Sequence, residues 1–507
     1  MPAQRRWLAL AVLATALALI SLDNTIVNVA LPRIQEDLGA TTSQLQWVVD
    51  AYSVMFAGTL LLAGSLGDRF GRRLVLLIGL VVFGVASFAA GLVDSAATLT
   101  VCRALMGIGG AFIMPSTLSI LVQVFREPRE RARAIGIWAA VAGVGVALGP
   151  IIGGLLLQNF SWQSIFWVNP PLVAIVLVAA LLLVPESRDE SRPMLDMRGA
   201  ALSSLGLIAL VVTIIELPEE GISVMTIVTT LLAVIGLSSF VWWERRAPRP
   251  LLPMSLFRQG AFTVPIVMVG LVYFALMGAM FLLPQFLQLV QAMGPLESGL
   301  AMLPAAGGLF VASLASPAIA ARLGARRLVV IGLGLVTLGL ALSSAFRTDT
   351  GYAYIGMSLA LVGVGMGLAL PQATNAVLAS VPRERSGMGS AVNDAVGELG
   401  GSFGVAILGA LMSVFYRARI EEAIASLGDR VSQVPDEVLS AVRESLASAF
   451  LIADELSDPG AEAVRIVTAD AFVEGMTWAM VVGATIVLLG LVLAWLKFPV
   501  RLERVEE

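Results

Sequence analysis

Fourteen apolar runs divide this sequence, and they constrain its fold more than any other feature. A helix of about 20 apolar residues crosses the hydrocarbon core of a bilayer, where backbone groups must bond within their own segment. The composition agrees, because 58% of the 507 residues are hydrophobic and only 13% are charged. We therefore predict an all-α polytopic membrane protein with 14 transmembrane helices. The predicted spans are approximately 7–31, 45–66, 74–93, 97–124, 134–158, 165–184, 199–216, 222–243, 261–290, 299–321, 327–346, 353–380, 387–415 and 473–497.

The basic residues predict the orientation of these spans. An even number of spans places both termini on one side. With the amino terminus inside, 24 of the 32 Lys and Arg residues lie in cytoplasmic segments and seven lie in external ones, while Arg103 falls within a span. Cytoplasmic loops carry such an excess, so we predict that both termini are cytoplasmic. We interpret the run after Arg5 and Arg6 as a first membrane helix, since no small-residue cleavage site is evident.

The sequence repeats at an interval of roughly half its length. Pro128–Arg131 returns as Pro382–Arg385, an offset of 254, and Gly107-x-Gly109 returns as Gly363-x-Gly365, an offset of 256. Parallel repeats of this kind place a substrate site between the halves near the membrane midplane. The repeat predicts an N-terminal six-helix bundle at 1–190, two linking transmembrane helices with their flanks at 191–260, and a C-terminal six-helix bundle at 261–507.

The longest segment outside the spans runs from about residue 417 to 471 and is external in this topology. It is rich in acids, and apolar residues such as Ile420 and Ile424, or Val442 and Leu446, recur at helical spacing. We predict two short amphipathic helices that pack as a hairpin over the outer mouth. A solvated loop is the alternative.

Several kinds of chemistry are excluded or disfavoured by what the sequence lacks. It has no histidine and a single cysteine, Cys102, so it has no imidazole relay and no intrachain disulfide. Lys497, the one lysine, follows the last apolar run and cannot belong to a nucleotide-binding glycine loop. We find no nucleophile–base set and no metal cluster. We therefore expect no metal, no cofactor and no enzymatic activity.

The link between the second and third spans is short and highly charged. It reads G-S-L-G-D-R-F-G-R-R from Gly64 to Arg73. Such charge cannot lie in lipid, so the link lies at a membrane face. It is either an ordinary positive loop or a gate that locks helix ends together on the cytoplasmic side. A degenerate copy at 316–327 has Ala321 in place of the acid. The gate residues are Gly64, Asp68, Arg69, Gly71, Arg72 and Arg73.

Few ionisable residues fall inside the spans, where they are costly and usually functional. Asp23 in the first span and Arg103 in the fourth lie at similar depth, so we expect them to pair, and we assign them to proton coupling together with Asp50. Asp394 and Glu398 are four residues apart and share one helix face. Because like charges this close do not both stay ionised, we expect one to be protonated. We assign both, with Asp50, to substrate binding.

The fifth span carries G-V-A-L-G-P-I-I-G-G. Proline removes a backbone donor and glycine permits close helix contact, so this stretch predicts a helix that can bend beside its partner. The residues assigned to it are Gly145, Gly149, Pro150, Gly153 and Gly154.

These motifs together resemble a known family. L-D-N-T-I-V-N-V-A-L-P at 22–32 resembles the first-helix signature of the fourteen-span drug:proton antiporters of the major facilitator superfamily. The gate loop, Arg103 with Gly107, and Gly145–Gly154 resemble further motifs of that superfamily, in the same order. Ser161–Pro171 is similar to the stretch entering its sixth helix.

Two other features look closest to the quaternary-ammonium exporter branch of that family. They are W-V-V-D-A-Y at 47–52, which contains Asp50, and the pair Asp394 and Glu398. Where that branch often has a second acid beside Asp394, this chain has Asn393.

The resemblance implies a proton-coupled antiporter of the bacterial cytoplasmic membrane that exports hydrophobic, cationic drugs or antibiotics by alternating access. Its partners would be hydrophobic small molecules, protons and the lipid bilayer, with no nucleic acid, and we expect a monomer. Export of a self-made antibiotic or another hydrophobic metabolite is the alternative. A proton-coupled nutrient symporter is disfavoured, because in this superfamily the motif at Gly145–Gly154 marks antiporters.

Overall fold

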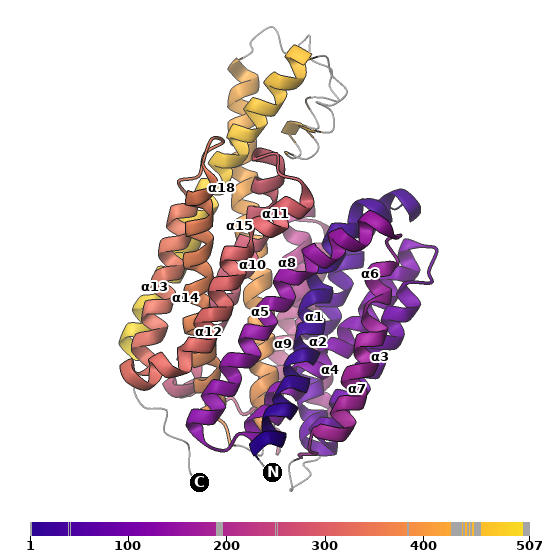
Figure 1. The fold of residues 1–507 in the computed structure, drawn as a ribbon, viewed down its shortest axis with the longest axis vertical. Helices are drawn as coiled ribbons and strands as arrows, with labels where there is room; N and C mark the ends of the chain where they lie inside the picture. The colour runs from indigo at the N-terminus through magenta and orange to yellow at the C-terminus, as the bar shows by residue number, and fades with distance from the viewer. Residues whose placement is uncertain are drawn as a thin grey trace.

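The protein is a bundle of long helices (Figure 1). The computed structural model describes residues 3–38, 40, 42–188, 196–248, 250, 252–382, 385–426, 439, 442–443, 446, 449–450 and 458–499. Within them, 14 helices are long and apolar enough to cross a membrane, which confirms the predicted number. The described residues contain no strand, which confirms the all-α class. The helices are α1 (Ala3–Leu38), α2 (Thr42–Phe70), α3 (Arg72–Ala90), α4 (Ala96–Val124), α5 (Pro128–Asn159), α6 (Ser164–Trp167), α7 (Asn169–Leu183), α8 (Met197–Glu220), α9 (Val224–Glu244), η1 (Leu256–Arg258), α10 (Gly260–Gln285), η2 (Phe286–Val290), α11 (Pro295–Ala301), α12 (Leu303–Leu323), α13 (Ala325–Ser343), α14 (Tyr352–Ala379), α15 (Ser386–Ser426) and α18 (Asp458–Lys497).

Prolines divide some of the predicted spans. The span at 165–184 consists of the short α6 followed by α7, which begins at Asn169 with two prolines directly after it. The span at 299–321 corresponds to α12, with Pro304 at its start and the short α11 before it. Proline has no backbone N–H and is tolerated in the first turn of a helix, so these breaks follow from the sequence.

The buried apolar side chains form two large clusters. One is built almost entirely from α1 to α7, and the other from α10 to α18. Between the halves, α2 packs on α15 and α5 packs on α12. Figure 1 accordingly shows the early helices on one side of the bundle and the late helices on the other. This distribution supports the division at 1–190, 191–260 and 261–507, which stays a proposal.

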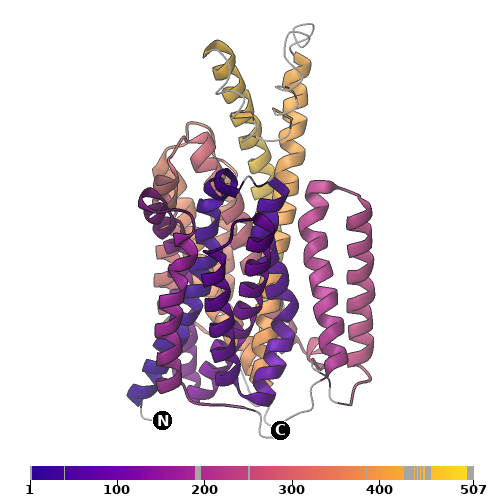
Figure 2. The same cartoon turned by 90° about the vertical axis from the view of Figure 1, so that its right-hand side faces the viewer.

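The linking helices α8 and α9 pack on each other at the edge of the bundle (Figure 2). A small apolar cluster joins α8 to α2 through Val54, Ala57, Val211 and Val212, and Leu399 of α15 packs against it. The linking pair is therefore attached where the two halves meet.

The internal repeat extends to the contacts between helices. Gly107 of α4 lies against the backbone of Tyr52, and Gly363 of α14 lies against the backbone of Ala305 in the same way. A side chain at either glycine would meet the facing carbonyl oxygen. In membranes, where lipid is as apolar as leucine, such close approach of small residues is what holds helices together. The two halves thus use equivalent glycines for equivalent contacts.

The segment predicted at 417–471 differs from the expectation at both ends. Helix α15 continues unbroken to Ser426 and α18 begins at Asp458, so both spanning helices project well beyond the rest of the bundle (Figures 1 and 2). The predicted ends of the spans at 415 and 473 are therefore wrong as helix ends, and no proline occurs in α15 to stop it there. The Tyr416 hydroxyl donates to the Val442 carbonyl oxygen at 2.8 Å, so a described part of the intervening chain lies on α15. Most of residues 427–457 lie outside the described residues.

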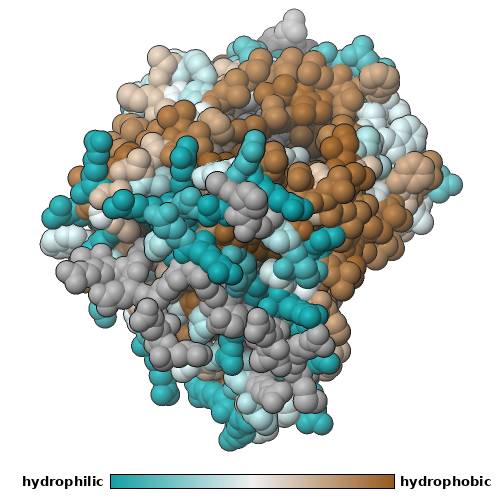
Figure 3. All heavy atoms as spheres, turned by 60° about the horizontal axis from the view of Figure 1, so that its bottom comes forward, coloured by the Kyte–Doolittle hydropathy of each residue, from teal (hydrophilic) through white to brown (hydrophobic). Residues whose placement is uncertain are grey.

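The surface has a polar end and an apolar flank beside it. The first turns of α1 and the last turn of α18 lie at the same end of the bundle (Figure 1). Hydrophilic side chains gather at that end, and hydrophobic ones cover the adjoining flank (Figure 3). Large exposed apolar side chains occur on α3, α7, α9 and α18, among them Val85, Ile175, Ile235 and Leu489. This pattern fits a protein surrounded by lipid.

The equivalent glycines generate a stability prediction. Gly107→Ala and Gly363→Ala should each lower the thermal unfolding midpoint of the detergent-purified protein, because overpacking costs about 1–3 kcal/mol. Gly307→Ala in α12 is the control, since an added Cβ there meets no neighbour. Equal midpoints for the three variants would contradict the close packing.

Candidate functional site

A fully buried ion pair joins α1 to α4. The Arg103 guanidinium donates to the Asp23 carboxylate at 2.6 Å, and the two side chains are 1% and 0% exposed. Asn169, at the start of α7, donates to the other Asp23 oxygen at 2.7 Å. Asp23 therefore has a partner on each carboxylate oxygen. An isolated charge at this depth would be strongly unfavourable, and these contacts offset that cost.

Two further contacts fix Arg103. Its Nε donates to the carbonyl oxygen of Val48 at 3.1 Å, and its guanidinium lies 4.6 Å from the centre of the Tyr52 ring. Both partners belong to α2, so Arg103 holds together three helices of the first half. The guanidinium is planar and keeps its charge, which suits it to simultaneous pairing and stacking.

Asn169 lies within the stretch Ser161–Pro171, but the sequence analysis assigned it no role. It also donates to the hydroxyl of Ser87 at 3.0 Å, and Ser87 donates to the Phe166 carbonyl oxygen at 2.8 Å. This chain of contacts ties α3 to the break between α6 and α7 and directs Asn169 toward Asp23. The available signal was a polar residue directly before two prolines within an apolar run.

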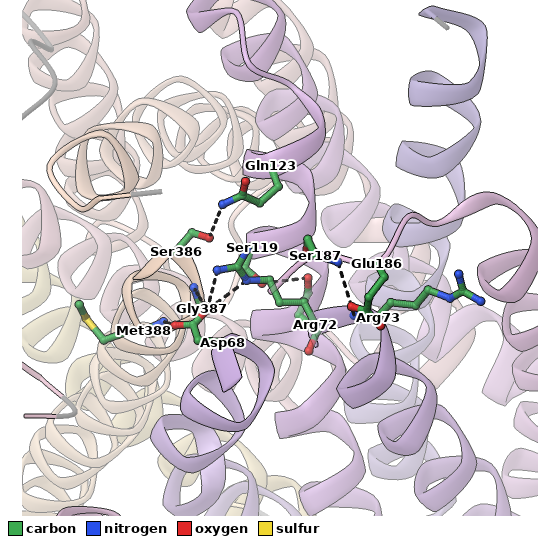
Figure 4. A network of polar contacts seen from close by, with 11 residues as sticks. Asp68, Arg72, Arg73, Ser119, Gln123, Glu186, Ser187, Ser386, Gly387 and Met388 are labelled. Atoms are coloured by element: carbon green, nitrogen blue, oxygen red, sulfur yellow. Dashed lines mark hydrogen bonds and ion pairs between the residues drawn. The ribbon is translucent and has the colours of Figure 1, made fainter. Parts of the chain in front are cut away.

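The second polar cluster lies at the end of the bundle that carries the termini (Figure 4). Asp68, near the end of α2, accepts from the backbone N–H groups of Gly387 at 3.0 Å and Met388 at 3.1 Å. Arg72 pairs with the same carboxylate at 2.7 Å. Helix α15 begins at Ser386, so Asp68 satisfies two of its first-turn donors and faces the positive end of its dipole. The carboxylate thus joins the two halves.

Other contacts between the halves lie near Asp68. Gln123 of α4 donates to the Ser386 hydroxyl at 3.5 Å, and Arg131 of α5 donates to Asn375 of α14 at 3.2 Å. The backbones of Gly64 and Gly387 lie in close contact. This end of the bundle is therefore closed in the described conformation.

The remaining gate residues bind the loop after α7. The backbone N–H of Arg72 donates to Ser187 and that of Arg73 donates to Glu186, at 2.9 and 3.1 Å. Gly71 has a φ of 122° and lies beside the Glu186 carboxylate, which excludes a side chain there. The Arg69 guanidinium lies 5.2 Å from the ring centre of Phe70. Gly324 in the degenerate copy also has a positive φ, of 87°, so the turn is repeated although the acid is not.

Asp394 and Glu398 lie on α15, one turn apart, with Asp394 3% exposed and Glu398 partly buried. Asn393 donates to Asp394 at 3.0 Å, while the other Asp394 oxygen is buried without a hydrogen-bond partner. Ser53 of α2 lies beside Glu398 across the junction of the halves. Tyr273 of α10 packs on Gly397, between the two acids in sequence. An acidic group with free acceptor capacity beside an aromatic ring can accommodate a cation or a proton.

The structure connects some of the predicted residues and separates others. Tyr52 lies under Arg103, the partner of Asp23, and the next residue, Ser53, lies beside Glu398, although the two acids belong to different halves. Asp50 is half-buried two residues before Tyr52 and does not share its helix face. The role assigned to Asp50 stays a prediction.

The glycine-rich stretch of α5 packs along α1. Gly145 lies against Ala18 and Ser21, and Gly149 lies against Thr25, whose hydroxyl donates to the Val146 carbonyl oxygen at 3.2 Å. Gly153 continues this face toward Ile26, whereas Gly154 has open space around it apart from Leu296. Helix α5 runs unbroken through Pro150. The stretch therefore brings α5 against the part of α1 that carries Asp23.

No group of three or more potential metal ligands occurs among the described residues.

Comparisons with known proteins agree on one family. The model of the Major Facilitator Superfamily matches residues 13–405. The chain is 36% identical over 486 residues to the multidrug efflux pump LfrA of Mycolicibacterium smegmatis, covering 96% of this chain and 94% of that protein. It is 34% identical to the tetracenomycin C resistance and export protein of Streptomyces glaucescens, covering 81% and 76%. It is 32% identical to the methyl viologen resistance protein SmvA of Salmonella typhimurium, covering 88% and 93%.

Two solved structures have a similar fold. The human organic anion transporter MFSD10 gives a TM-score of 0.64 at 16% identity, covering 97% of this chain and 100% of that one. The proton:xylose symporter XylE gives 0.65 at 13% identity, covering 100% and 99%.

The Asp68 contacts generate a prediction about closure. Asp68→Asn should make a cysteine at buried Ser390, one turn into α15, react faster with a thiol reagent in a Cys102→Ala background. The amide loses the charge and presents an N–H to a backbone donor. A lost charge-assisted bond costs about 1.5–3 kcal/mol, which shifts the closed population about tenfold or more.

The matched control is Glu130→Gln. It removes an ion pair with Arg6 at the same end, but that pair lies within the first half. If the cysteine introduced at Ser390 reacts at the parental rate in both variants, Asp68 does not hold the halves together.

Proposed function

The chain belongs to the Major Facilitator Superfamily, and from this premise we propose that it is a proton-coupled antiporter that exports hydrophobic, cationic drugs or antibiotics by alternating access. The names of the relatives support efflux, since they describe multidrug pumps and resistance proteins. The methyl viologen resistance protein bears on charge in particular, because methyl viologen is an organic dication.

One observation carries the proposal: α15 carries two carboxyl groups, one buried and one partly buried, on the helix that packs against α2 of the other half. Asp394 has an oxygen without a hydrogen-bond partner, and Glu398 lies beside Ser53. A carboxyl group that is protonated when the site is empty can release its proton when a cation arrives. The substrate cation and the proton then occupy the same site in turn. Such competition between the two is what an exchange mechanism requires.

Asp23 is proposed as the second proton site. Protonation would remove the charge that pairs with Arg103 and weaken the contacts among α1, α4 and α7. Arg103 would keep its contacts to Val48 and Tyr52, so α2 would sense the change. A proton could in this way alter the helix that faces the substrate acids.

We propose that the chain lies in the bacterial inner membrane, and its charge distribution supports an orientation there. We propose that both termini face the cytoplasm, which agrees with the 24 basic residues assigned to that side. The end closed by Asp68 is then the cytoplasmic end, and the long ends of α15 and α18 project outside. We propose that the protein works as a monomer and carries out no covalent chemistry.

Export of a self-made antibiotic is the second candidate. The tetracenomycin C resistance and export protein and the puromycin resistance protein pur8, 32% identical over the whole of this chain, come from Streptomyces. In both readings the machinery is the same and only the substrate differs. Proton-driven uptake of dye into inverted vesicles, abolished by a protonophore, tests the function shared by both, and uptake that a protonophore leaves unchanged would contradict it.

Loss of Asp23 should abolish coupling. Asp23→Asn is expected to stop uptake of dye into inverted vesicles driven by an imposed pH difference. Arg103→Ala should do the same, because breaking a buried pair leaves a charge at a cost of about 3–5 kcal/mol. Both variants should still bind dye. Concentration of dye by Asp23→Asn under the same pH difference would remove Asp23 from the coupling step.

The acid pair generates a prediction about substrate charge. Asp394→Asn and Glu398→Gln should each reduce transport of divalent cationic dyes most, monovalent dyes less and neutral substrates least, because each removes a counter-charge from the core. Glu422→Gln, an exposed acid on the same helix that pairs with Arg419, is the matched control and should change none of the three. Equal losses across the three classes would show that the pair is structural or serves protons alone.

A further inference from the structure

The linking helices carry a group of tryptophan and arginine side chains at the end of the bundle that holds the termini. Trp242 and Trp243 lie in the last turn of α9, Arg245 and Arg246 directly follow that helix, and Arg198 lies in the first turn of α8 beside it. We call these five residues the Trp–Arg site. They take no part in the contacts of the ion pair, the gate or the acid pair.

Two open hollows of about 400 and 780 Å³ adjoin each other at this place. Ser238 and Trp242 line both, Arg245 and Arg246 line the larger, and Trp243 lines the smaller. Above them, Val234 and Ile235 of α9 are 58% and 60% exposed and continue as an apolar strip. The site is therefore polar and cationic at the end of α9 and apolar along the helix face beside it.

Aromatic rings hold two of the three arginines, Arg246 and Arg198, in position. The Arg246 guanidinium lies 4.4 Å from the Trp242 ring centre, and that of Arg198 lies 5.1 Å from the Trp243 ring centre. The Trp243 indole N–H donates to Asp196 at 2.6 Å, which fixes that ring. Stacked guanidinium groups lose less conformational entropy when they bind an anion than mobile ones do.

The acids nearby face other groups. Asp196 caps α8 through the N–H of Gly199 at 2.9 Å, and buried Glu244 accepts from the N–H of Leu252 at 2.9 Å. No ion pair involves Arg245 or Arg246 among the described residues, and both side chains are exposed. The outward charge of the site is positive.

From this juxtaposition we propose that the Trp–Arg site binds an anionic phospholipid, with its phosphate on Arg245 and Arg246 and its acyl chains along the exposed face of α9. Arginine recognises phosphate through paired N–H groups, and tryptophan favours the headgroup region. Anionic lipid on the cytoplasmic leaflet supplies the complementary charge. The lipid would hold the linking pair, whose other face packs on α2 and α15. This proposal does not depend on drug export.

The test measures the thermal unfolding midpoint of the full chain in detergent with added lipid. Phosphatidylglycerol should raise the midpoint by about 3 °C or more, and phosphatidylcholine of the same acyl length should not. In the double variant Arg245→Gln, Arg246→Gln the rise should fall by at least half. Arg326→Gln with Arg327→Gln, a basic pair at the start of α13, is the matched control and should keep the full rise.

Several results would overturn the proposal. They are an equal response to both lipids, an undiminished response in the Arg245, Arg246 variant, and a response to inorganic phosphate alone that matches that of the lipid. A mass of two chains in detergent that falls to one chain in this variant would show that a second copy covers the site instead. Native mass spectrometry gives an independent reading, since phosphatidylglycerol retained by the parent should be lost from the variant and kept by the control. The midpoint of each variant without lipid reports whether it has folded.

Discussion

The hydrocarbon core contains no water, and the arrangement of this chain follows from that constraint. Backbone groups must be satisfied within each segment, so the spans are helices. Helices in lipid gain nothing from excluding water from one another, so they associate where glycine lets their backbones meet, as at Gly107 and Gly363. A charge must have its partners inside the protein. Asp23 has two such partners and Asp68 has three, including two backbone N–H groups.

The buried polar contacts fall into two kinds. Those around Asp23 and Arg103 join helices of the first half only, whereas those around Asp68 join α2 to the start of α15. In the proposed alternating access, contacts inside a half can persist while the halves move, but contacts between halves must break when the closed end opens. A lock made of one carboxylate and two exchangeable N–H donors costs less to open than a buried ion pair, because the first turn of α15 can bond to water when released. The degenerate copy in the second half has Ala321 in place of the acid, so it cannot form an equivalent carboxylate contact.

The spans, the repeat and the pairing of Asp23 with Arg103 could be predicted because each has a signal in residue type: apolar length, recurring glycines, and opposite charges at one depth. The partners of Asp68 could not, since they are backbone groups of Gly387 and Met388 and any residue provides them. The positions of Ser53 and Tyr273 beside the acid pair could not be predicted either, because a neutral side chain in an apolar run has no distinctive sequence pattern. The extension of α15 to Ser426 was missed because the change from apolar to polar composition marks the membrane boundary and not the end of a helix.

Helix α2 links the features that the proposed exchange has to coordinate. Its Tyr52 lies under the Arg103 guanidinium, its next residue, Ser53, lies beside Glu398, and its last turns carry Asp68 to α15. Residues 52 and 53 lie about 100° apart around the helix axis, so one helix can face both acids at once. A helix is stiff over this length, and a change in the charge of Asp23 that shifts α2 must also shift its contacts with α15. Coupling between the proposed proton site and the proposed substrate acids would then need no relay of side chains, because both sites contact one rigid element.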